Sequence, residues 1–427
     1  MSPTAAAGAT PARRLYYGWV LVGALGVTET VSYGILSYAL PVFIIPLGQD
    51  PGWSRTAVTG AFSLASLVAG VAAVPVGRWV DRHGARGVMT AGSCLAVLLL
   101  LAWSRVESLP AFYLVHAGLG VAMAATLYEP AFAVVASWFV RQRGRALTVL
   151  TFLGGFASVI FVPLATGLVE AYGWRTALVC LAALLALLTL PPHALLLRRR
   201  PEELGLAVDG GAVGPAAAAP PEAERSVPAR EAVRSRSFRW LALAFGLSAL
   251  VTTGLTVHLI PLLRERGFVA GFAGAALGAV GVMALPGRLV FTPLGDRWPR
   301  PAVTASLLAL QAAGIAVLLA TRSAAGVWTF VVLFGAGFGA ITPARAALLA
   351  DLYGRDQYAR IGGVLALGVA LARAAAPVGV SLLYAAEGGY QAVLWTLLGI
   401  SAAAGVAVLA AGRGEAGPPP STTEENT

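Results

Sequence analysis

The chain has 427 residues, of which 58% are hydrophobic and only 12% are charged, against roughly 25% charged residues in an ordinary soluble domain. A soluble protein this apolar could not cover its own surface, whereas lipid can act as the solvent for the outside of a membrane protein. The net charge is +10 and every basic residue is an arginine, but these arginines stand in short clusters between apolar runs, which excludes a nucleic-acid-binding protein with one basic stripe.

Twelve apolar runs are long enough to cross a bilayer, which takes about 20 residues. They cover residues 18–46, 54–76, 86–104, 110–139, 146–169, 174–197, 239–263, 270–294, 301–320, 326–350, 359–385 and 390–411. The first run is not followed by the small-residue site of a cleavable signal peptide. The sequence therefore predicts an all-α membrane protein with twelve transmembrane helices.

The arginines predict how these helices are oriented. With the N-terminus in the cytoplasm, the inside segments hold the central-loop arginines together with Arg13, Arg14, Arg78, Arg82, Arg86, Arg141, Arg143, Arg145, Arg198, Arg199, Arg200, Arg297, Arg300, Arg355, Arg360 and Arg413. The outside loops hold only Arg55, Arg105, Arg175, Arg264, Arg266 and Arg322. Because cytoplasmic loops carry the excess of basic residues, we expect a multi-pass protein of the cell membrane with both termini in the cytoplasm.

The chain divides into two halves around residues 198–236. This stretch is rich in Ala, Pro, Gly and charge and has no apolar face, so we expect a flexible cytoplasmic linker. The predicted parts are a cytoplasmic N-terminus (1–17), an N-terminal six-helix bundle (18–197), the linker (198–236), a C-terminal six-helix bundle (237–411) and a disordered cytoplasmic tail (412–427).

The two halves repeat one another at offsets of 213 to 215 residues. The matching pairs, in chain order, are 42–47 with 257–262, Asp81-Arg82 with Asp296-Arg297, Pro130 with Pro343, Arg141 with Arg355, and Pro163 with Pro377. Two six-helix halves with the same orientation are parallel repeats, which place a solute path between them. This pattern predicts a solute transporter.

The loop after the second run, Gly77-x-x-x-Asp81-Arg82-x-Gly84-x-Arg86, resembles the signature loop of the major facilitator superfamily. A glycine permits close helix approach, an aspartate can pair with arginine and cap a helix end, and arginines suit the anionic inner surface of a membrane. The second copy keeps Asp296-Arg297 but has Thr292 and Pro299 in place of the glycines. The resemblance implies the major facilitator fold, with a gating role for Gly77, Asp81, Arg82, Gly84, Arg86, Asp296 and Arg297.

Three further motifs are similar to bacterial members of the monocarboxylate transporter group: Tyr17-Gly18-Trp19, the loop 138–147, and Gly287-Arg288 eight residues before Asp296. The resemblance implies that Arg288 binds substrate. Two departures limit it. The lysine that animal members carry in the first span falls on Ser37, and their aspartate before the arginine falls on Ala284, so their proton relay does not carry over.

Charged side chains inside the spans are the candidates for chemistry, because each costs roughly 2.5–3.5 kcal/mol at the bilayer centre. The guanidinium fork suits a carboxylate, and Arg288 is our first choice for substrate. Arg345 is expected to be a gate, an ion-pair partner or a substrate ligand, and Arg373 a substrate ligand. Glu29 and Glu129 are expected to carry protons; the alternative is that each neutralises an arginine.

Four polar residues complete the predicted binding site. Tyr33 and Ser37 follow Glu29 at successive helical turns and form a polar stripe, which could also be a packing face. Tyr128 adjoins Glu129 but points about 100° away around the helix, so we expect only one of the two to be central. His258 occupies the repeat position of Phe43 and suits proton coupling or ligand binding, or is a satisfied cavity histidine.

We expect the chain to move a small organic anion, in particular a monocarboxylate, by alternating access with a proton. The alternative is a proton-coupled efflux pump for a drug-like or toxic solute, although the Gly-Pro pattern of drug exporters is absent from the fifth span. The expected partners are the solute, protons and the lipid bilayer, with no nucleic acid, and we expect a monomer. Cys94 and Cys180 have no metal-site spacing, and we expect both to be buried. No catalytic, metal or cofactor motif stands out, so neither an enzyme nor a cofactor is expected.

Overall fold

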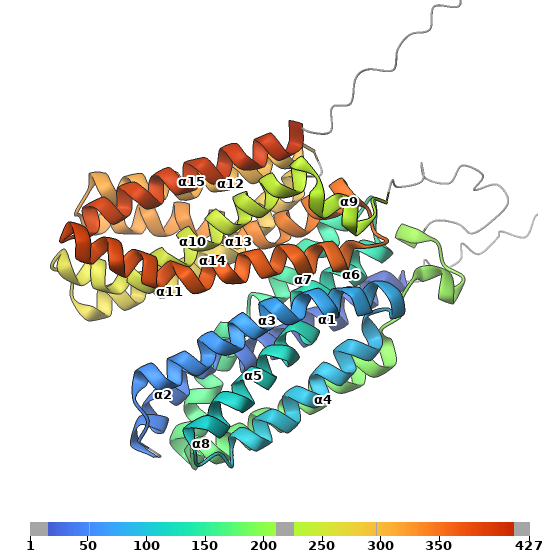
Figure 1. Cartoon of the computed structure of the whole chain (residues 1–427), viewed down its shortest axis with the longest axis horizontal. Helices are drawn as coiled ribbons and strands as arrows, with labels where there is room; N and C mark the ends of the chain where they lie inside the picture. Colours follow the sequence, from blue (N-terminus) through green and yellow to red (C-terminus); the bar gives the residue numbers. More distant parts are fainter. Residues whose placement is uncertain (1–15, 51, 211–225, 296, 414–427) are drawn as a thin grey trace, which may run out of the picture.

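A computed structural model describes residues 16–50, 52–210, 226–295 and 297–413 (Figure 1). Within these ranges the chain is helical and forms no strand. The predicted gating residue Asp296, most of the predicted N-terminal and C-terminal segments, and the middle of the predicted linker lie outside the described residues. The first half contains α1 (Tyr17–Tyr33), the π-helix η1 (Gly34–Tyr38), α2 (Leu40–Gln49), α3 (Arg55–His83), α4 (Ala85–Trp103), α5 (Leu109–Thr126), α6 (Tyr128–Trp138), α7 (Arg143–Gly154), α8 (Ala157–Pro191) and η2 (Pro192–Leu196).

Short helices occupy part of the segment predicted to be a linker: η3 (Pro201–Leu204), η4 (Val208–Gly210) and α9 (Ala229–Arg234). The second half then contains α10 (Arg236–Glu265), α11 (Ala270–Leu294), α12 (Arg300–Ala320), α13 (Ala324–Tyr353), α14 (Tyr358–Glu387) and α15 (Tyr390–Arg413). The folded parts of the linker therefore adjoin both halves of the chain.

Eleven helical stretches in the described part are long and apolar enough to cross a membrane. One of them, Arg143–Leu196, has 54 residues, which as a single helix would measure about 80 Å, far more than the hydrocarbon core. Gly173 breaks it with a φ of 76°, a conformation that glycine adopts without a steric penalty. This stretch therefore makes two passes, and the twelve predicted transmembrane helices are confirmed.

Two of the passes are interrupted near their middle. The first pass changes from α1 to the π-helix η1 before α2 begins. The fourth pass breaks at Leu127, which has extended backbone angles between α5 and α6. Pro130 explains this break, because it has no N–H to donate to the carbonyl of Thr126 and its ring would clash with that carbonyl. The break places Tyr128 and Glu129 in the first turn of α6.

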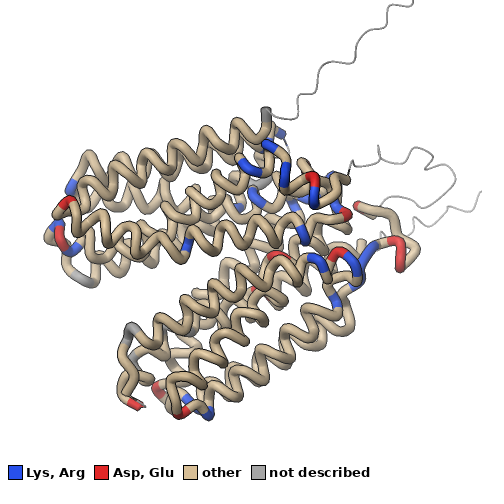
Figure 2. The backbone as a smooth tube through the Cα atoms, in the orientation of Figure 1, with Lys and Arg blue, Asp and Glu red and all other residues tan. Residues whose placement is uncertain are grey.

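The helices form two bundles, α1–α8 and α10–α15, that meet at one end and diverge toward the other (Figure 1). Arginines gather where the bundles meet (Figure 2). We call this region the basic end; it carries Arg78, Arg82, Arg86, Arg141, Arg143, Arg199, Arg200, Arg300, Arg355 and Arg360. The positive-inside bias predicted from the sequence would place the basic end in the cytoplasm.

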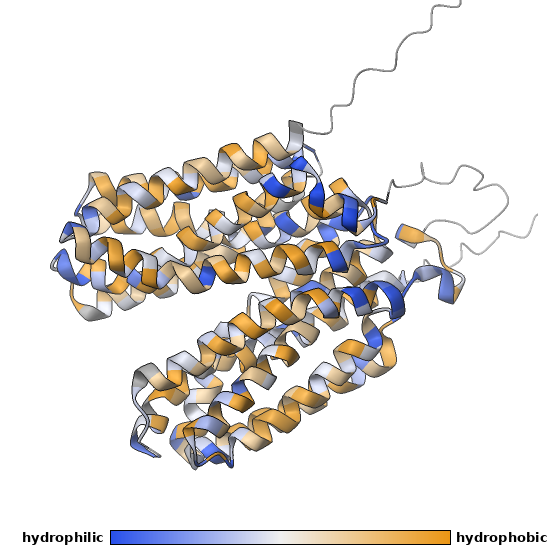
Figure 3. Cartoon of the chain, viewed as in Figure 1, coloured by the Kyte–Doolittle hydropathy of each residue, from blue (hydrophilic) through white to orange (hydrophobic). Residues whose placement is uncertain are grey.

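The outer surface of the bundles is apolar along the helix shafts (Figure 3). Leu98 is 63% exposed and Leu114 is 75% exposed, which fits a surface whose solvent is lipid. Cys94 is exposed and Cys180 is partly exposed, so the prediction that both cysteines are buried in the protein was wrong. An apolar run in a membrane protein can face lipid as well as a protein core, and sequence alone does not separate the two.

Glycines bring α11 and α13 into backbone contact. A methyl group on Gly335 would lie 2.8 Å from the carbonyl oxygen of Val280, and one on Gly287 would overlap the carbonyl of Ala336. Small residues at helix contacts promote helix association in membranes. Close packing has to supply this energy, because helices that are already surrounded by lipid gain no hydrophobic energy when they associate. This close packing carries Arg288, on α11, up to the backbone of α13.

We expect Gly335→Val to destabilise the fold, because overpacking a tight contact costs about 1–3 kcal/mol. The matched control is Gly281→Val on α11, since nothing lies within 4 Å of a methyl group at that glycine. Thermal unfolding of the detergent-purified chain should show a lower midpoint for Gly335→Val than for Gly281→Val. Equal midpoints would contradict the importance of this contact.

Candidate substrate-binding site and interface between the halves

The charged residues predicted to act inside the membrane come from both bundles. Glu29 lies on α1 and Glu129 on α6, whereas Arg288, Arg345 and Arg373 lie on α11, α13 and α14. The carboxyl groups therefore belong to one half and the guanidinium groups to the other. These five side chains have different hydrogen-bond and ion-pair partners, and the roles that each can have differ accordingly.

Glu129 and Arg345 form an ion pair across the interface between the halves. The Arg345 Nη2 atom donates to Glu129 Oε1 at 2.6 Å, and the two side chains are 15% and 23% exposed respectively. An ion pair this enclosed binds its two helices together, because removing one partner would leave the other charge without compensation. In this structure the pair ties α6 to α13.

Arg288 already has acceptors in the protein. Its Nε atom donates to the carbonyl of Gly339 at 3.0 Å, and its Nη1 atom donates to the carbonyl of Thr151 on α7. Gly155 leaves the room for this contact, since a methyl group there would lie 2.7 Å from Arg288 Nη1. Arg288 therefore ties α7 to α11 and α13, and part of its fork is occupied.

Arg373 is the arginine of the three that has no acceptor among the described residues. Its side chain is exposed although it lies in the middle of α14. It is within electrostatic range of Tyr33 and Tyr38 of the first pass, and of Glu129 and Arg345. The exposed guanidinium thus faces groups of the opposite half, and its hydrogen-bond donors are free for a ligand.

Aromatic rings line the side of the first half near Arg373. Tyr33 lies 4.7 Å from Tyr128 and 6.3 Å from Tyr38 between ring centroids, and Tyr128 stacks on Phe132 at 5.0 Å. We call these four residues the aromatic wall. Within the described residues, the hydroxyl groups of Tyr33 and Tyr38 have no hydrogen-bond partner.

The π-helix explains why Tyr38 belongs to this wall. In an α-helix the residue four positions after Tyr33 shares its face, which led us to expect a stripe of Tyr33 and Ser37. In the π-helical turn Gly34–Tyr38 the backbone bonds run from i to i+5, so Tyr38 comes to lie beside Tyr33. Ser37 is partly buried. No residue pattern in the sequence indicates the π-helical turn.

Glu29 is fully buried, and neither of its carboxylate oxygens has a partner among the described residues. It is within electrostatic range of Glu129, Tyr33 and Tyr128. An ionised carboxylate without hydrogen bonds in an apolar site is costly. The surroundings of Glu29 therefore suit a neutral carboxyl group better than an ionised one.

His258 lies apart from this cluster and uses both ring nitrogens within its own half. Nδ1 is 3.0 Å from the Tyr390 hydroxyl, and Nε2 is 3.3 Å from both the Pro377 carbonyl and the Ser381 hydroxyl. A shallow apolar pocket surrounds it between α10 and α14. Among the described residues, the hydrogen-bond partners of His258 thus all belong to the second half.

The signature loop lies at the basic end, where the halves touch. Asp81 accepts hydrogen bonds from the backbone N–H groups of Ala359 at 3.0 Å and Arg360 at 2.9 Å, and so caps the N-terminus of α14. Gly77 permits the approach, because a methyl group there would overlap the carbonyl of Ala359. Gly84 turns the chain from α3 to α4 with a φ of 81°, whereas Arg82, Arg86 and Arg297 are exposed.

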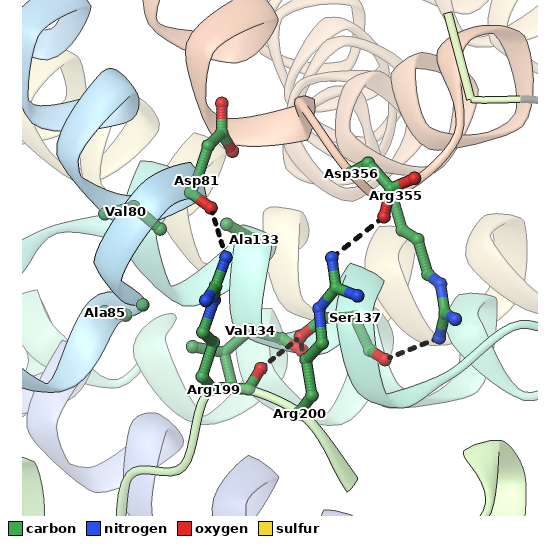
Figure 4. Close-up of a pocket in the computed structure, with 11 residues that line it drawn as sticks. Val80, Asp81, Ala85, Ala133, Val134, Ser137, Arg199, Arg200, Arg355 and Asp356 are labelled. Atoms are coloured by element: carbon green, nitrogen blue, oxygen red, sulfur yellow. Dashed lines mark hydrogen bonds and ion pairs between the residues drawn. The ribbon is translucent and has the colours of Figure 1, made fainter. Parts of the chain in front are cut away.

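A pocket beside Asp81 shows how the two halves and the linker meet (Figure 4). Arg199 donates to the backbone carbonyl of Asp81 at 2.9 Å, and Arg200 pairs with Asp356 at 2.9 Å. Asp351 is a further member of the basic end that sequence reasoning missed; it pairs with Arg300 at 3.0 Å and with Arg143 at 3.5 Å. Most of the polar contacts between the halves in the described part of the chain thus lie toward this end.

Comparison with known proteins decides the family. The family model described as "Major Facilitator Superfamily" matches residues 25–377. The chain belongs to the Major Facilitator Superfamily. It is accordingly a membrane transporter and not an enzyme, as the sequence predicted.

Among its relatives is the human protein named "Monocarboxylate transporter 11", which is 31% identical over 71% of this chain; the chain spans 62% of that relative's length. The Bacillus subtilis protein named "Uncharacterized MFS-type transporter YcxA" is 25% identical, over 76% of this chain and 78% of its own. The crystal structure of the superfamily transporter FucP in the outward conformation matches with a TM-score of 0.74 at 14% identity, covering 93% of this chain and 99% of that one. The predicted resemblance to monocarboxylate transporters is confirmed, and the structural likeness shows the fold.

We expect the single variants Arg345→Gln and Glu129→Gln to be less stable than the double variant. Each single change leaves a partly buried charge without its partner, which costs about 3–5 kcal/mol for a buried pair, whereas the double change removes both charges. Thermal unfolding of the purified chain measures this. A double variant that is no more stable than either single variant would contradict the pairing.

Proposed function

We propose that this superfamily member transports a small organic anion, a monocarboxylate, across the cell membrane by alternating access, with the basic end in the cytoplasm and with coupling to protons. The observation that carries the proposal is Arg373, an exposed guanidinium in the middle of α14 with no acceptor among the described residues. A free guanidinium fork binds one carboxylate through two parallel hydrogen bonds. The names of the relatives support the same class of substrate.

In this proposal the three arginines have different tasks. Arg373 binds the carboxylate, and Tyr33 and Tyr128 line the site. Arg288 and Arg345 hold the halves together through the carbonyl of Thr151 and the carboxylate of Glu129, so they respond to the substrate rather than bind it first. Arg373 therefore replaces Arg288 as our first choice for the substrate.

Proton coupling is assigned to Glu29 and Glu129 together. Glu29 is buried and has no hydrogen-bond partner among the described residues. Its ionised form becomes less unfavourable when an anion leaves Arg373 or when water enters the site. The Glu129 carboxylate pairs with Arg345, and a proton on this carboxylate would weaken that pair. A proton on Glu129 would thus loosen the interface on the side of the basic end, as alternating access requires.

We expect proteoliposomes containing the chain to take up at least one member of a panel of labelled monocarboxylates, including lactate, pyruvate and 4-hydroxybenzoate, faster under an inward proton gradient. Arg373→Gln should abolish saturable uptake, and Arg373→Lys should raise the KM about tenfold, because the charge stays but the fork is lost. Arg322→Gln, an exposed arginine far along the chain from the site, is the control and should transport normally.

The variant Glu29→Gln should transport without acceleration by the proton gradient, because the amide cannot take up or release the proton. Absence of saturable uptake for the whole panel, or uptake unchanged by Arg373→Gln, would contradict the proposed function. Uptake that keeps its dependence on the gradient in Glu29→Gln and in Glu129→Gln would contradict the coupling alone.

A further inference from the structure

The guanidinium of Arg373 lies within electrostatic range of two rings and one carboxylate of the first half, those of Tyr33, Tyr38 and Glu129. Glu129 is already paired with Arg345, whereas Tyr33 and Tyr38 belong to the aromatic wall. Ring faces and edges attract other rings in offset or T-shaped arrangements with centroids 4.5–7 Å apart. A ligand held by its carboxylate at Arg373 would therefore place the rest of its body against aromatic surface.

The residues of α14 next to Arg373 have only methyl side chains. Ala374 and Ala375 are exposed, whereas Ala372 lies toward α10, where a methyl group on Gly246 would lie 4.0 Å from it. These neighbours therefore add no bulk that would hinder the approach of a flat ring to Arg373.

We propose that the anion transported through this site is an aromatic monocarboxylate, with its carboxylate on Arg373 and its ring against Tyr33 and Tyr38. The inference rests on the proposed function and narrows its substrate class. The free hydroxyl groups of Tyr33 and Tyr38 would accept or donate a hydrogen bond to a substituent on the ring, so a hydroxybenzoate fits this site better than an unsubstituted ring.

Binding to the detergent-purified full-length chain, measured by calorimetry, tests the inference without the problem that aromatic acids cross bilayers unaided. The probes are 4-hydroxybenzoate, benzoate, lactate and cyclohexanecarboxylate, the last of which has a ring of similar size that is not flat. We expect benzoate and 4-hydroxybenzoate to bind about tenfold more tightly than lactate and cyclohexanecarboxylate. Tyr38→Ala should weaken benzoate severalfold and leave lactate unchanged, while Tyr38→Phe should weaken only 4-hydroxybenzoate.

Two failures can be told apart. If lactate binds as tightly as benzoate, or if Tyr38→Ala weakens both equally, the aromatic substrate class is wrong while binding that depends on Arg373 still stands. If no carboxylate in the set loses affinity in Arg373→Gln, the proposed function itself is wrong.

A second inference rests on a different observation, the carboxylate of Asp209 in the linker. It accepts hydrogen bonds from three successive backbone N–H groups that precede α7: Val140 at 3.1 Å, Arg141 at 2.8 Å and Gln142 at 3.2 Å. To do so Asp209 adopts a φ of 59°. Among the described residues it is the one non-glycine residue with a positive φ. Such a strained conformation persists where the surroundings hold it.

Neighbouring contacts fix the same segment to the first half. The Trp138 indole donates to the Arg198 carbonyl at 3.2 Å, and the Ser137 hydroxyl donates to the Arg199 carbonyl at 3.2 Å. The Tyr16 side chain covers Gly210 and donates to the Trp138 carbonyl at 3.1 Å. Burial, and then the charges of Asp209 and Glu202, raise the pKa of Tyr16 to about 12, so its hydroxyl remains a donor at neutral pH.

From this fixed position the segment reaches the second half. Arg200 pairs with Asp356 at 2.9 Å (Figure 4). Glu202 lies 3.7 Å from Arg355. The other described end of the linker binds the loop between α13 and α14. Val227 N–H donates to the Tyr353 carbonyl at 3.1 Å, and Ala229 N–H donates to the Gln357 side chain at 2.7 Å. The loop between α13 and α14 is thus held by both described ends of the linker.

We infer that residues 199–209 form a linker clamp that holds the two halves together at the basic end, and that Asp209 is its positioning residue. Exposed ion pairs such as Arg200–Asp356 contribute little when their side chains are mobile. The backbone contacts of Asp209 remove this mobility. The clamp therefore adds to the Asp81 cap of α14 and favours the conformation that is closed at the basic end.

Labelling of a buried cysteine at the basic end tests the clamp independently of transport. In a background with Cys94→Ala and Cys180→Ala, the reporter is Ala133→Cys, because Ala133 lines the pocket of Figure 4 and is only 8% exposed. In nanodiscs, Asp209→Asn and Arg200→Glu should each raise the rate of maleimide labelling roughly three- to tenfold, as expected for the loss of charge-assisted bonds. The control Glu231→Gln removes a linker carboxylate with no ion pair among the described residues and should not change the rate.

The double variant Arg200→Asp with Asp356→Arg reverses the pair and should restore slow labelling, which separates a clamp from a general loss of folding. Thermal unfolding of each variant identifies any that fails to fold. Labelling rates for Asp209→Asn and Arg200→Glu equal to that of Glu231→Gln would overturn the clamp, and so would a reversed pair that labels as fast as Arg200→Glu.

Discussion

A charge in the middle of a membrane protein needs a partner or water, and in this chain the partners are distributed unequally. Glu129 and Arg345 satisfy each other across the halves, and Arg288 is satisfied by backbone carbonyls. Arg373 has no acceptor, and Glu29 has no donor, among the described residues. Because an uncompensated charge is costly away from water, Arg373 is the group that the proposed ligand would affect first, and Glu29 is the one that the proposed proton step would affect first. The roles proposed for these residues in the transport cycle follow from this difference in partners.

The contacts between the halves involve the same helix that carries Arg373. Gly77 and Gly363 let α3 and α14 meet backbone to backbone, and Asp81 fixes the start of α14. Arg373 lies about four turns further along the same helix. In the proposed function, a ligand that draws Arg373 toward the aromatic wall would act on the helix that Asp81 holds at the basic end, so that binding and closure would share one helix.

The sequence predicted the twelve helices, the repeat and the family because these depend on apolar length and on motifs that stand in order along the chain. It also selected Glu29, Glu129, Arg288, Arg345 and Arg373 as charges inside the membrane. It could not show how the arginines differ, since the partners of Arg288 are carbonyl groups of Thr151 and Gly339 on other helices. Tyr38 was missed because a π-helical turn moves it by one position, and Asp209 because a polar, proline-rich segment carries no periodic signal.

The repeat also explains why the linker matters for this member of the superfamily. Asp81 of the first half caps α14, the fifth helix of the second half, and α7 is the corresponding helix of the first half. The second signature copy has lost both of its glycines to Thr292 and Pro299, and the backbone N–H groups before α7 are bound by Asp209 of the linker. A carboxylate thus binds backbone N–H groups at the N-terminus of each of the two equivalent helices. Asp81, which binds α14, belongs to the first half, whereas Asp209, which binds the residues before α7, belongs to the linker. The first ties the halves directly, whereas the second does so only through the ion pairs of residues 200 and 202, so the interface is held unequally along the two sides of the repeat axis.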